Sequence, residues 1–396
     1  MKEQVVSNNT GSQWSSVYVH IPFCASRCIY CGFYSTVGSG LEASYVSALE
    51  QELSLRAKYL PPDRPIRTIY LGGGTPSQLS PNLLERILRQ VDKLIVTPHN
   101  HGLKVEETTI ECNPDDVSET FSQALYSLGV NRVSLGIQTF DDHRLLFLHR
   151  RHNASQAEEA IRRLRHSGIN NISIDLMFGF PGQTVADWEH DIERALSLRP
   201  THISAYGLTY EEGTPLEHHL REGLISTIDE ETQRLMYDLL CDRLESFGYE
   251  HYEISNFALP GFRSRHNSGY WNRVPYLGLG AAAHSYDGNS RQWNVSNLKR
   301  YIQQISHGEV PMEREILDEQ SRWNDLIVTA FRTCDGIDLR AVREEFGEAY
   351  LQFLLQSAQA HLEQDLLKIE EGALRLTRQG IHVSDMVMTD FVRVKG

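Results

Sequence analysis

Residues 18–31 read Tyr-Val-His-Ile-Pro-Phe-Cys-Ala-Ser-Arg-Cys-Ile-Tyr-Cys. Three cysteines, Cys24, Cys28 and Cys31, therefore follow a short apolar run in the spacing CxxxCxxC. Thiolate sulfur suits iron, and three closely spaced thiolates can hold three corners of a cubane iron–sulfur cluster. Because no fourth cysteine lies nearby in the sequence, one iron of such a cluster stays open to a different ligand.

A structural zinc site is the alternative for the same residues, with His20 as the fourth ligand, because zinc prefers four nitrogen or sulfur ligands. Zinc modules usually contain two separated pairs of ligands, whereas these three cysteines share one loop. The other cysteines, Cys112, Cys241 and Cys334, stand singly in the sequence, which is typical of free thiols. The pattern favours the iron–sulfur cluster.

The composition is that of a folded protein: the chain has 396 residues, of which 40% are hydrophobic. This length accommodates one large domain and a smaller one. The net charge of −14 argues against binding to nucleic acid, which requires clustered Lys and Arg. The first 16 residues do not resemble a signal peptide, and no run of about 18 apolar residues predicts a membrane span. We expect a cytoplasmic protein, a compartment that keeps thiols reduced.

Six short β-rich runs alternate with segments of helical periodicity. The β-rich runs are residues 17–21, 67–74, 108–112, 132–136, 172–177 and 202–207. The helical segments are residues 42–59, 81–94, 118–128, 155–166, 186–198 and 230–247. This alternation predicts an α/β fold with a parallel sheet covered by helices. Six units are too few for a closed eight-stranded barrel, so we expect a partial (β/α)6 barrel, with a doubly wound sheet as the alternative.

The sequence predicts four parts: a disordered tail at 1–16, the barrel at 17–248, a cap and linker region at 249–320 and a C-terminal module at 321–396. Within the cap we expect one strand from Tyr249 to Asn256 and an irregular, glycine-rich stretch at 276–284. The C-terminal module combines helices with a β-hairpin over 365–377 that turns at Glu-Gly. That combination predicts a helical, winged-helix-like module.

Polar residues follow the predicted strands of the barrel. Gly72-Gly-Gly-Thr-Pro76 lets a ligand approach the backbone and exposes amide donors. Glu111 could accept hydrogen bonds from a ribose or an amino group, although the Asn-Pro-Asp after Cys112 is also ordinary turn chemistry. Gln138, Arg150 and Asp175 add an amide, a cation and a carboxylate, a set suited to a second nucleoside or a carboxylated ligand. We expect these residues to meet at the carboxyl ends of the strands.

His266 begins the sequence His-Asn-Ser-Gly-Tyr-Trp271, which we expect to form a glycine-containing loop. An isolated histidine beside aromatics is more often a packing residue than a ligand. Imidazole is nevertheless the usual axial ligand of haem iron, and flat aromatic rings suit a porphyrin face. His266 is therefore a candidate haem contact, with packing as the alternative.

Taken together, these motifs resemble the oxygen-independent coproporphyrinogen III oxidase family of radical S-adenosylmethionine (SAM) proteins. The similar segments are YVHIPFCASRCIYC, GGGTP, ECNPD, GIQTF, HRRHN, SIDLMFGFPGQT and HNSGYW, in a match that spans roughly residues 17–390. Within that family the chain is more similar to the HemW-type haem chaperone branch. Gly32-Phe33 follow Cys31 where the oxidases carry another cysteine, their long N-terminal extension is absent, and HNxxYW is characteristic of the chaperones.

The resemblance implies a 4Fe–4S cluster on Cys24, Cys28 and Cys31. It assigns the contacts to cluster-bound SAM to Tyr18, Gly73 and Glu111, with Tyr30 alongside. In the oxidases a second SAM binds nearby, and its contacts correspond here to Gly74, Thr75, Gln138, Arg150 and Asp175.

The function implied by the resemblance is that of a chaperone that binds the cluster, SAM and haem and passes haem to haem-dependent respiratory proteins. Its partners would then be haem and acceptor proteins, with peripheral contact to membrane-bound acceptors and no nucleic acid. The alternative is an enzyme that oxidatively decarboxylates the propionates of coproporphyrinogen III with a SAM-derived radical.

The C-terminal module should not bind DNA despite its winged-helix-like pattern. From Asp318 onward the chain contains nine Lys and Arg against fourteen Asp and Glu, so no excess of positive charge is available to neutralise phosphates. We expect the full-length protein to show no salt-sensitive shift of a duplex DNA probe at moderate ionic strength. A shift that disappears when residues 318–396 are deleted would contradict this.

Overall fold

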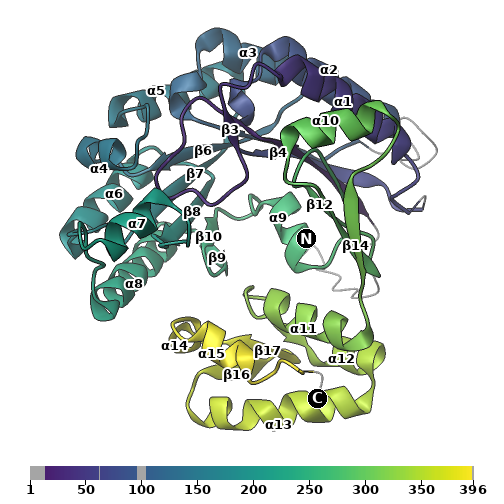
Figure 1. Cartoon of the computed structure of the whole chain (residues 1–396). Helices are drawn as coiled ribbons and strands as arrows, with labels where there is room; N and C mark the ends of the chain where they lie inside the picture. The colour runs from purple at the N-terminus through teal and green to yellow at the C-terminus, as the bar shows by residue number, and fades with distance from the viewer. Residues whose placement is uncertain (1–13, 62, 96–103, 395–396) are drawn as a thin grey trace, which may run out of the picture.

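The computed structural model describes residues 14–61, 63–95 and 104–394 (Figure 1). Six parallel strands form the centre of its main sheet, and they are the six predicted from the sequence. They are β1 (Ser15–Ile21), β4 (Ile66–Gly73), β5 (Glu107–Cys112), β6 (Arg132–Gln138), β7 (Asn171–Phe178) and β8 (His202–Gly207). β1 begins inside the predicted tail, because Ser15 and Ser16 already pair with neighbouring strands. The rest of that tail, residues 1–13, lies outside the described residues.

The central strands lie side by side in chain order, from β1 through β4, β5, β6 and β7 to β8. The helices that follow these strands in the chain line the outer, convex side of the curved sheet (Figure 1). These helices are α1 (Glu42–Leu55), α2 (Pro81–Ile95), α3 (Glu119–Ser127), α5 (Ala154–Ser167), α6 (Val185–Ser197) and α8 (Glu230–Ser246). A doubly wound sheet would reverse its order at the first strand. The partial, open (β/α)6 barrel is therefore confirmed.

The central strands alternate apolar and polar side chains. In β6, Val133, Leu135 and Ile137 are fully buried in the core that the helices share. The alternating residues Arg132, Ser134 and Gln138 point to the opposite, concave face, because successive side chains of a strand face opposite sides. The helix-facing side is therefore an ordinary hydrophobic core, and the inner face is left for polar chemistry.

Short elements interrupt the loops at the carboxyl ends of the strands. β2 (Phe23–Cys24) pairs with β3 (Thr36–Val37) in the cysteine loop. Helices α4 (Asp142–Phe147) and α7 (Pro215–Arg221) follow β6 and β8 and were not predicted. Both helices have fewer than eight residues, too few for a clear helical period in the sequence.

The glycine-rich stretch at 276–284, predicted to be irregular, instead extends the sheet beyond β1. β11 (Tyr276–Leu279) pairs in parallel with β1, and β12 (His284–Tyr286), β13 (Ser290–Asn294) and β14 (Met312–Ile316) continue the sheet in antiparallel fashion. A Cβ atom at Gly278 would lie 1.8 Å from the carbonyl oxygen of His284. The glycine thus permits close pairing of β11 with β12 rather than breaking the strand. Helix α10 (Leu298–Ser306) lies between β13 and β14.

The strand predicted from Tyr249 to Asn256 is instead a hairpin of two strands at the other edge of the sheet. β9 (Glu250–Glu253) and β10 (Asn256–Ala258) pair with each other, and β10 also pairs antiparallel with β8. The carboxylate of Glu253 accepts hydrogen bonds from the Ser255 amide and the Asn256 side chain, which stabilises the turn.

The HNSGYW segment is a helix, α9 (Arg265–Trp271), so the predicted loop is wrong. The Ser264 hydroxyl caps this helix by accepting a hydrogen bond from the amide of Asn267. The carboxylate of Glu107, which is distant in sequence, accepts hydrogen bonds from the amides of Arg265 and His266 at 2.9 and 3.0 Å. These tertiary bonds outweigh the low helix propensity of Gly269.

The C-terminal module has its own core around the fully buried Trp323. Its helices are α11 (Glu319–Ala330), α12 (Leu339–Phe346), α13 (Glu348–Glu363), α14 (Arg378–Ile381) and α15 (Ser384–Thr389). The predicted hairpin is present as β16 (Leu367–Glu370) and β17 (Ala373–Leu376), and β15 (Ile337–Asp338) adds a third strand. The module lies below the barrel (Figure 1), and Arg332 bonds to Glu253 at 2.9 Å. None of the described helices is long and apolar enough to cross a bilayer.

A buried carboxylate joins the extension of the sheet to helix α1. Glu52 has no exposed surface and accepts hydrogen bonds from the side chains of Arg56, Asn294 and Tyr301 and from the amide of Gly280. Removing one member of such a network leaves the other polar groups buried without partners.

Glu52→Ala should therefore lower the free energy of unfolding by about 3 to 5 kcal/mol. Glu50→Ala is the matched control, because Glu50 pairs with Arg86 at the surface and should contribute less than about 1 kcal/mol. Urea unfolding followed by circular dichroism compares the two variants. Equal losses of stability would show that the Glu52 network does not hold the extension in place.

Candidate functional site

The three cysteines lie together in the loop that follows β1. Cys24 ends β2, and Cys28 and Cys31 follow within the same partly exposed loop, all as free thiols. Burial raises the pKa of the Cys31 thiol, and the nearby thiols of Cys28 and Cys24 raise it further. Three thiols this close repel one another when ionised, and a bound metal centre removes that repulsion.

Hydrogen-bond donors face two of the sulfur atoms. The Thr75 hydroxyl donates to Cys24 Sγ at 3.4 Å, and the Arg150 guanidinium donates to Cys28 Sγ at 3.5 Å. Hydrogen-bond donors of this kind are suited to sulfur atoms that ligate a metal. The cysteine loop therefore suits thiolate ligation, and it fits a cluster bound at three corners.

The zinc alternative is not supported by the geometry around His20. Its Nδ1 contacts the Tyr18 hydroxyl and its Nε2 contacts the carbonyl oxygen of Tyr34, both at 3.1 Å, so neither nitrogen is free to bind a metal. Within residues 14–61, 63–95 and 104–394, no three His, Cys, Asp or Glu side chains surround one ion position. A cubane cluster does not need that arrangement, because each thiolate binds a different iron.

The glycines of Gly72-Gly-Gly-Thr-Pro76 lie against the cysteine loop. The Gly74 amide donates to the Ile21 carbonyl at 2.8 Å, and a Cβ atom at Gly74 would lie 3.1 Å from Cys24 Sγ. Gly73 has a φ of 114°, and a Cβ atom there would lie 2.6 Å from the imidazole of His20. Only glycine fits this close approach.

Glu111 connects this glycine segment to the inner face of the barrel. Its carboxylate accepts hydrogen bonds from the Gly73 amide at 3.0 Å and from the Tyr70 hydroxyl at 2.8 Å. Burial raises the pKa of Glu111 to about 7. The ring of Tyr18 stacks on Tyr70 with 6.1 Å between centroids. The structure thus brings together Tyr18, Gly73 and Glu111, and their contact with SAM stays a prediction.

The second predicted set also lies beside the cysteine loop. A Cβ atom at Gly136 would lie 3.0 Å from the Gln138 amide nitrogen and 3.2 Å from the Arg150 guanidinium, so these two side chains meet there. Asp175 lies opposite Gly136 in the neighbouring strand, and burial raises its pKa to about 6. Burial also raises the pKa of Tyr30, whose ring lies near Arg150 and Cys28.

Arg132 is a buried residue of the inner face that the sequence interpretation missed. Its side chain is 1% exposed, and neither Nε nor Nη1 has a hydrogen-bond partner among the described residues. Its positive charge opposes the rise in the pKa of Glu111 and of Asp175. The sequence could have indicated this position, because Arg132 is separated from Ser134 and Gln138 by even numbers of positions, which places all three on the same face of the strand.

His266 lies on the inner face of the barrel. It is 1% exposed and stacks on Tyr70 with 4.9 Å between ring centroids. Its Nδ1 contacts the Thr68 hydroxyl and its Nε2 the Tyr270 hydroxyl, both at 2.9 Å. Burial lowers the pKa of His266 to about 3, so the imidazole is neutral, the form that binds metals. Contact of His266 with haem stays a prediction, with packing as the alternative role. Tyr70 links His266 to Glu111, because its ring stacks on the imidazole and its hydroxyl donates to the carboxylate.

Comparison with known proteins places the chain among the radical SAM proteins. The Radical SAM superfamily model matches residues 18–195, and the HemN C-terminal domain model matches residues 317–383. "Heme chaperone HemW" of Bacillus subtilis (strain 168) is 36% identical over 382 residues, which cover 95% of this chain and 99% of that protein. The protein of the same name from Lactococcus lactis is 33% identical over 381 residues, which cover 96% of this chain and 97% of that protein. The chain belongs to the HemW family.

The fold of this HemW family member is that of a solved radical SAM enzyme. The structure of coproporphyrinogen III oxidase (HemN) from Escherichia coli matches with a TM-score of 0.81 and covers 96% of this chain and 90% of that chain. At 21% identity this similarity concerns the fold alone. Membership in the radical SAM superfamily implies a 4Fe–4S cluster and SAM, which the free thiols of the cysteine loop fit.

Replacing Cys24, Cys28 or Cys31 by Ala should abolish cluster assembly and leave the protein folded, because these side chains lie in a partly exposed loop. Iron and sulfide content after anaerobic reconstitution is the measurement. Cys334→Ala is the matched control, since Cys334 is an exposed free thiol outside this loop, and it should retain the wild-type iron content. A loop variant with undiminished iron and sulfide would overturn the ligand assignment.

Proposed function

We propose that the protein is a haem chaperone: it holds a 4Fe–4S cluster and SAM, binds haem and delivers it to haem-dependent proteins. The observation that carries this proposal is the similarity over nearly the full length of both chains to a protein named a heme chaperone. The buried, neutral His266 could bind haem iron only after its Nε2 leaves the Tyr270 hydroxyl, which it contacts at 2.9 Å.

The residues of the cysteine loop and its neighbours have distinct roles in this proposal. Cys24, Cys28 and Cys31 hold the cluster, and Thr75 and Arg150 donate hydrogen bonds to the sulfur atoms of Cys24 and Cys28. Glu111 fixes Gly73 through its amide and keeps the glycine segment close to the cluster ligands. When bound, the cluster and SAM supply one-electron chemistry.

Coproporphyrinogen III oxidation is the second candidate, supported by the shared fold of the E. coli oxidase. Fold similarity at 21% identity does not carry an activity, however. Phe33 occupies the position where the resemblance places a further cysteine in the oxidases, and its side chain is 71% exposed. An anaerobic assay of the reconstituted protein with coproporphyrinogen III and SAM distinguishes the two functions, because only an oxidase would release carbon dioxide from the propionates.

We further propose that the protein acts in the cytoplasm and contacts membrane-bound acceptors only peripherally. The six cysteines are all free thiols, as is usual for proteins of a reducing compartment. Delivery would then require transient docking on the acceptor.

His266 and Tyr270 offer a matched pair of substitutions to test the haem contact. If His266 Nε2 binds haem iron, it must leave the Tyr270 hydroxyl, so Tyr270→Phe should keep or strengthen haem binding and retain the wild-type Soret band. His266→Gln should weaken haem binding about tenfold or more and shift the Soret maximum.

Cluster content serves as the folding control for both variants, because the cysteines lie in the loop after β1 whereas His266 and Tyr270 lie in helix α9. An unchanged affinity and spectrum for His266→Gln would rule out the ligand role and leave the packing role. Wild-type protein that binds no haem would rule out the chaperone proposal itself.

A further inference from the structure

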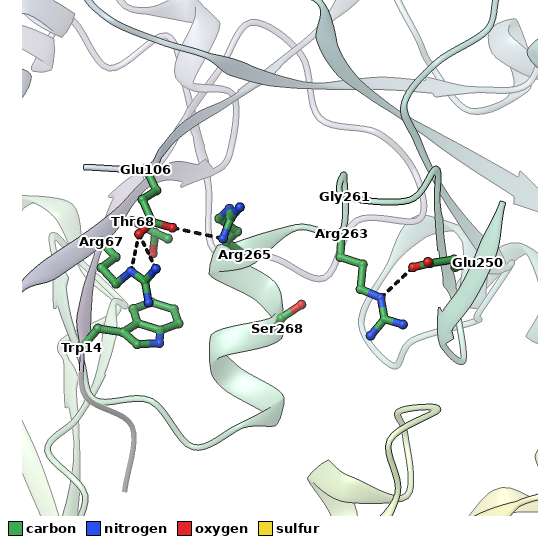
Figure 2. Close-up of a pocket in the computed structure, with 9 residues that line it drawn as sticks. All are labelled: Trp14, Arg67, Thr68, Glu106, Glu250, Gly261, Arg263, Arg265 and Ser268. Atoms are coloured by element: carbon green, nitrogen blue, oxygen red, sulfur yellow. Dashed lines mark hydrogen bonds and ion pairs between the residues drawn. The ribbon is translucent and has the colours of Figure 1, made fainter. Parts of the chain in front are cut away.

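A pocket of about 310 Å³ lies at the amino-terminal edge of the sheet, where Trp14, Arg67, Arg263 and Arg265 contribute to its walls (Figure 2). Arg67 is at the start of β4, whose other end carries Gly73 beside the cysteine loop. At about 3.3 Å per residue, the stretch of β4 from Arg67 to Gly73 separates the two regions by roughly 20 Å. The pocket is therefore distinct from the predicted SAM and cluster site.

The charges in this pocket favour a carboxylate ligand. Arg67 and Arg265 both pair with the single carboxylate of Glu106, the latter at 3.0 Å. Figure 2 shows the two guanidinium groups on either side of Glu106. One carboxylate cannot satisfy two guanidinium groups, each of which has five N–H donors. These ion pairs are partly exposed, so an arriving carboxylate can join or exchange with Glu106 at little cost.

An aromatic ring and a polar wall complete the pocket. The guanidinium of Arg67 lies over the ring of Trp14, with 5.8 Å to its centroid. Across the pocket, Arg263 donates to the carboxylate of Glu250 at 3.0 Å, and Ser268 of α9 lies between the two sides (Figure 2). A flat face bordered by cations suits a planar aromatic ligand that carries carboxylates.

The pocket shares a wall with the predicted haem contact. Thr68 lines the pocket, and its hydroxyl contacts Nδ1 of His266 at 2.9 Å. Arg265 and His266 are consecutive residues of α9. Arg265, which lines the pocket, is therefore adjacent in the chain to the predicted haem contact.

We infer that this pocket binds the propionate carboxylates of haem through Arg67 and Arg265, with Trp14 beside the macrocycle. The inference rests on the proposed haem chaperone function and adds a recognition site to it. Bidentate guanidinium–carboxylate pairs give both affinity and orientation, which a single iron ligand does not provide.

The test compares haem with haem dimethyl ester, whose carboxylates are blocked, in the same detergent, by Soret titration of the full-length protein. Wild-type protein should bind haem about tenfold more tightly than the ester. The double variant Arg67→Gln/Arg265→Gln should lose about tenfold in affinity for haem and bind the ester as before. Glu106→Gln should instead raise the affinity for haem, because it removes the carboxylate that pairs with both guanidinium groups. The affinity for the ester should not change.

Arg300→Gln is the matched control: Arg300 is an exposed arginine of α10 whose guanidinium donates to Gln304. It should behave as wild type, and all variants should retain the wild-type iron and sulfide content. A double variant that keeps the preference for haem, or a Glu106→Gln variant that lowers it, would overturn the pocket and leave the chaperone proposal standing. Wild-type protein that binds no haem would overturn both.

Discussion

The hydrogen bonds of the Glu111 carboxylate organise the candidate site. One oxygen accepts the Gly73 amide and the other the Tyr70 hydroxyl, so a single side chain at the end of β5 fixes two parts of β4. Gly73 and Gly74 then lie against the cysteine loop, and Tyr70 lies against His266. Burial makes this carboxylate costly to ionise, and it retains its place because both oxygens have donors.

The two faces of the sheet carry different residues: apolar side chains pack under the helices on one face, and polar side chains line the other face. Val133, Leu135 and Ile137 belong to the hydrophobic core under the helices, so the apolar packing of this strand lies on its outer face. Arg132 on the inner face keeps two nitrogens without partners among the described residues, a state that a purely structural core would not tolerate. Polar groups held in this way by a stable outer layer are preorganised for a ligand.

The sequence predicted the central strands, most of their helices and the clustering of the cysteines with Gly73 and Glu111. Those features depend on local period and on the rule that parallel strands share a carboxyl edge. The errors arose where residues distant in sequence decide the outcome. Glu107 makes a helix of the HNSGYW segment, and the close approach of His284 makes Gly278 a strand residue. Neither contact leaves a periodic signal.

Helix α9 carries both the predicted haem contact and part of the wall of the pocket, and its being a helix rather than a loop fixes how these residues lie. A loop could present His266 independently of its neighbours, whereas in a helix the positions of Arg265, His266 and Tyr270 are fixed relative to one another. His266 therefore faces Tyr70 and, through it, Glu111 at the cofactor end, while Arg265 faces the pocket at the opposite edge. A ligand that displaces His266 would remove the ring that stacks on Tyr70, and the hydroxyl of Tyr70 donates to the Glu111 carboxylate at the cofactor end.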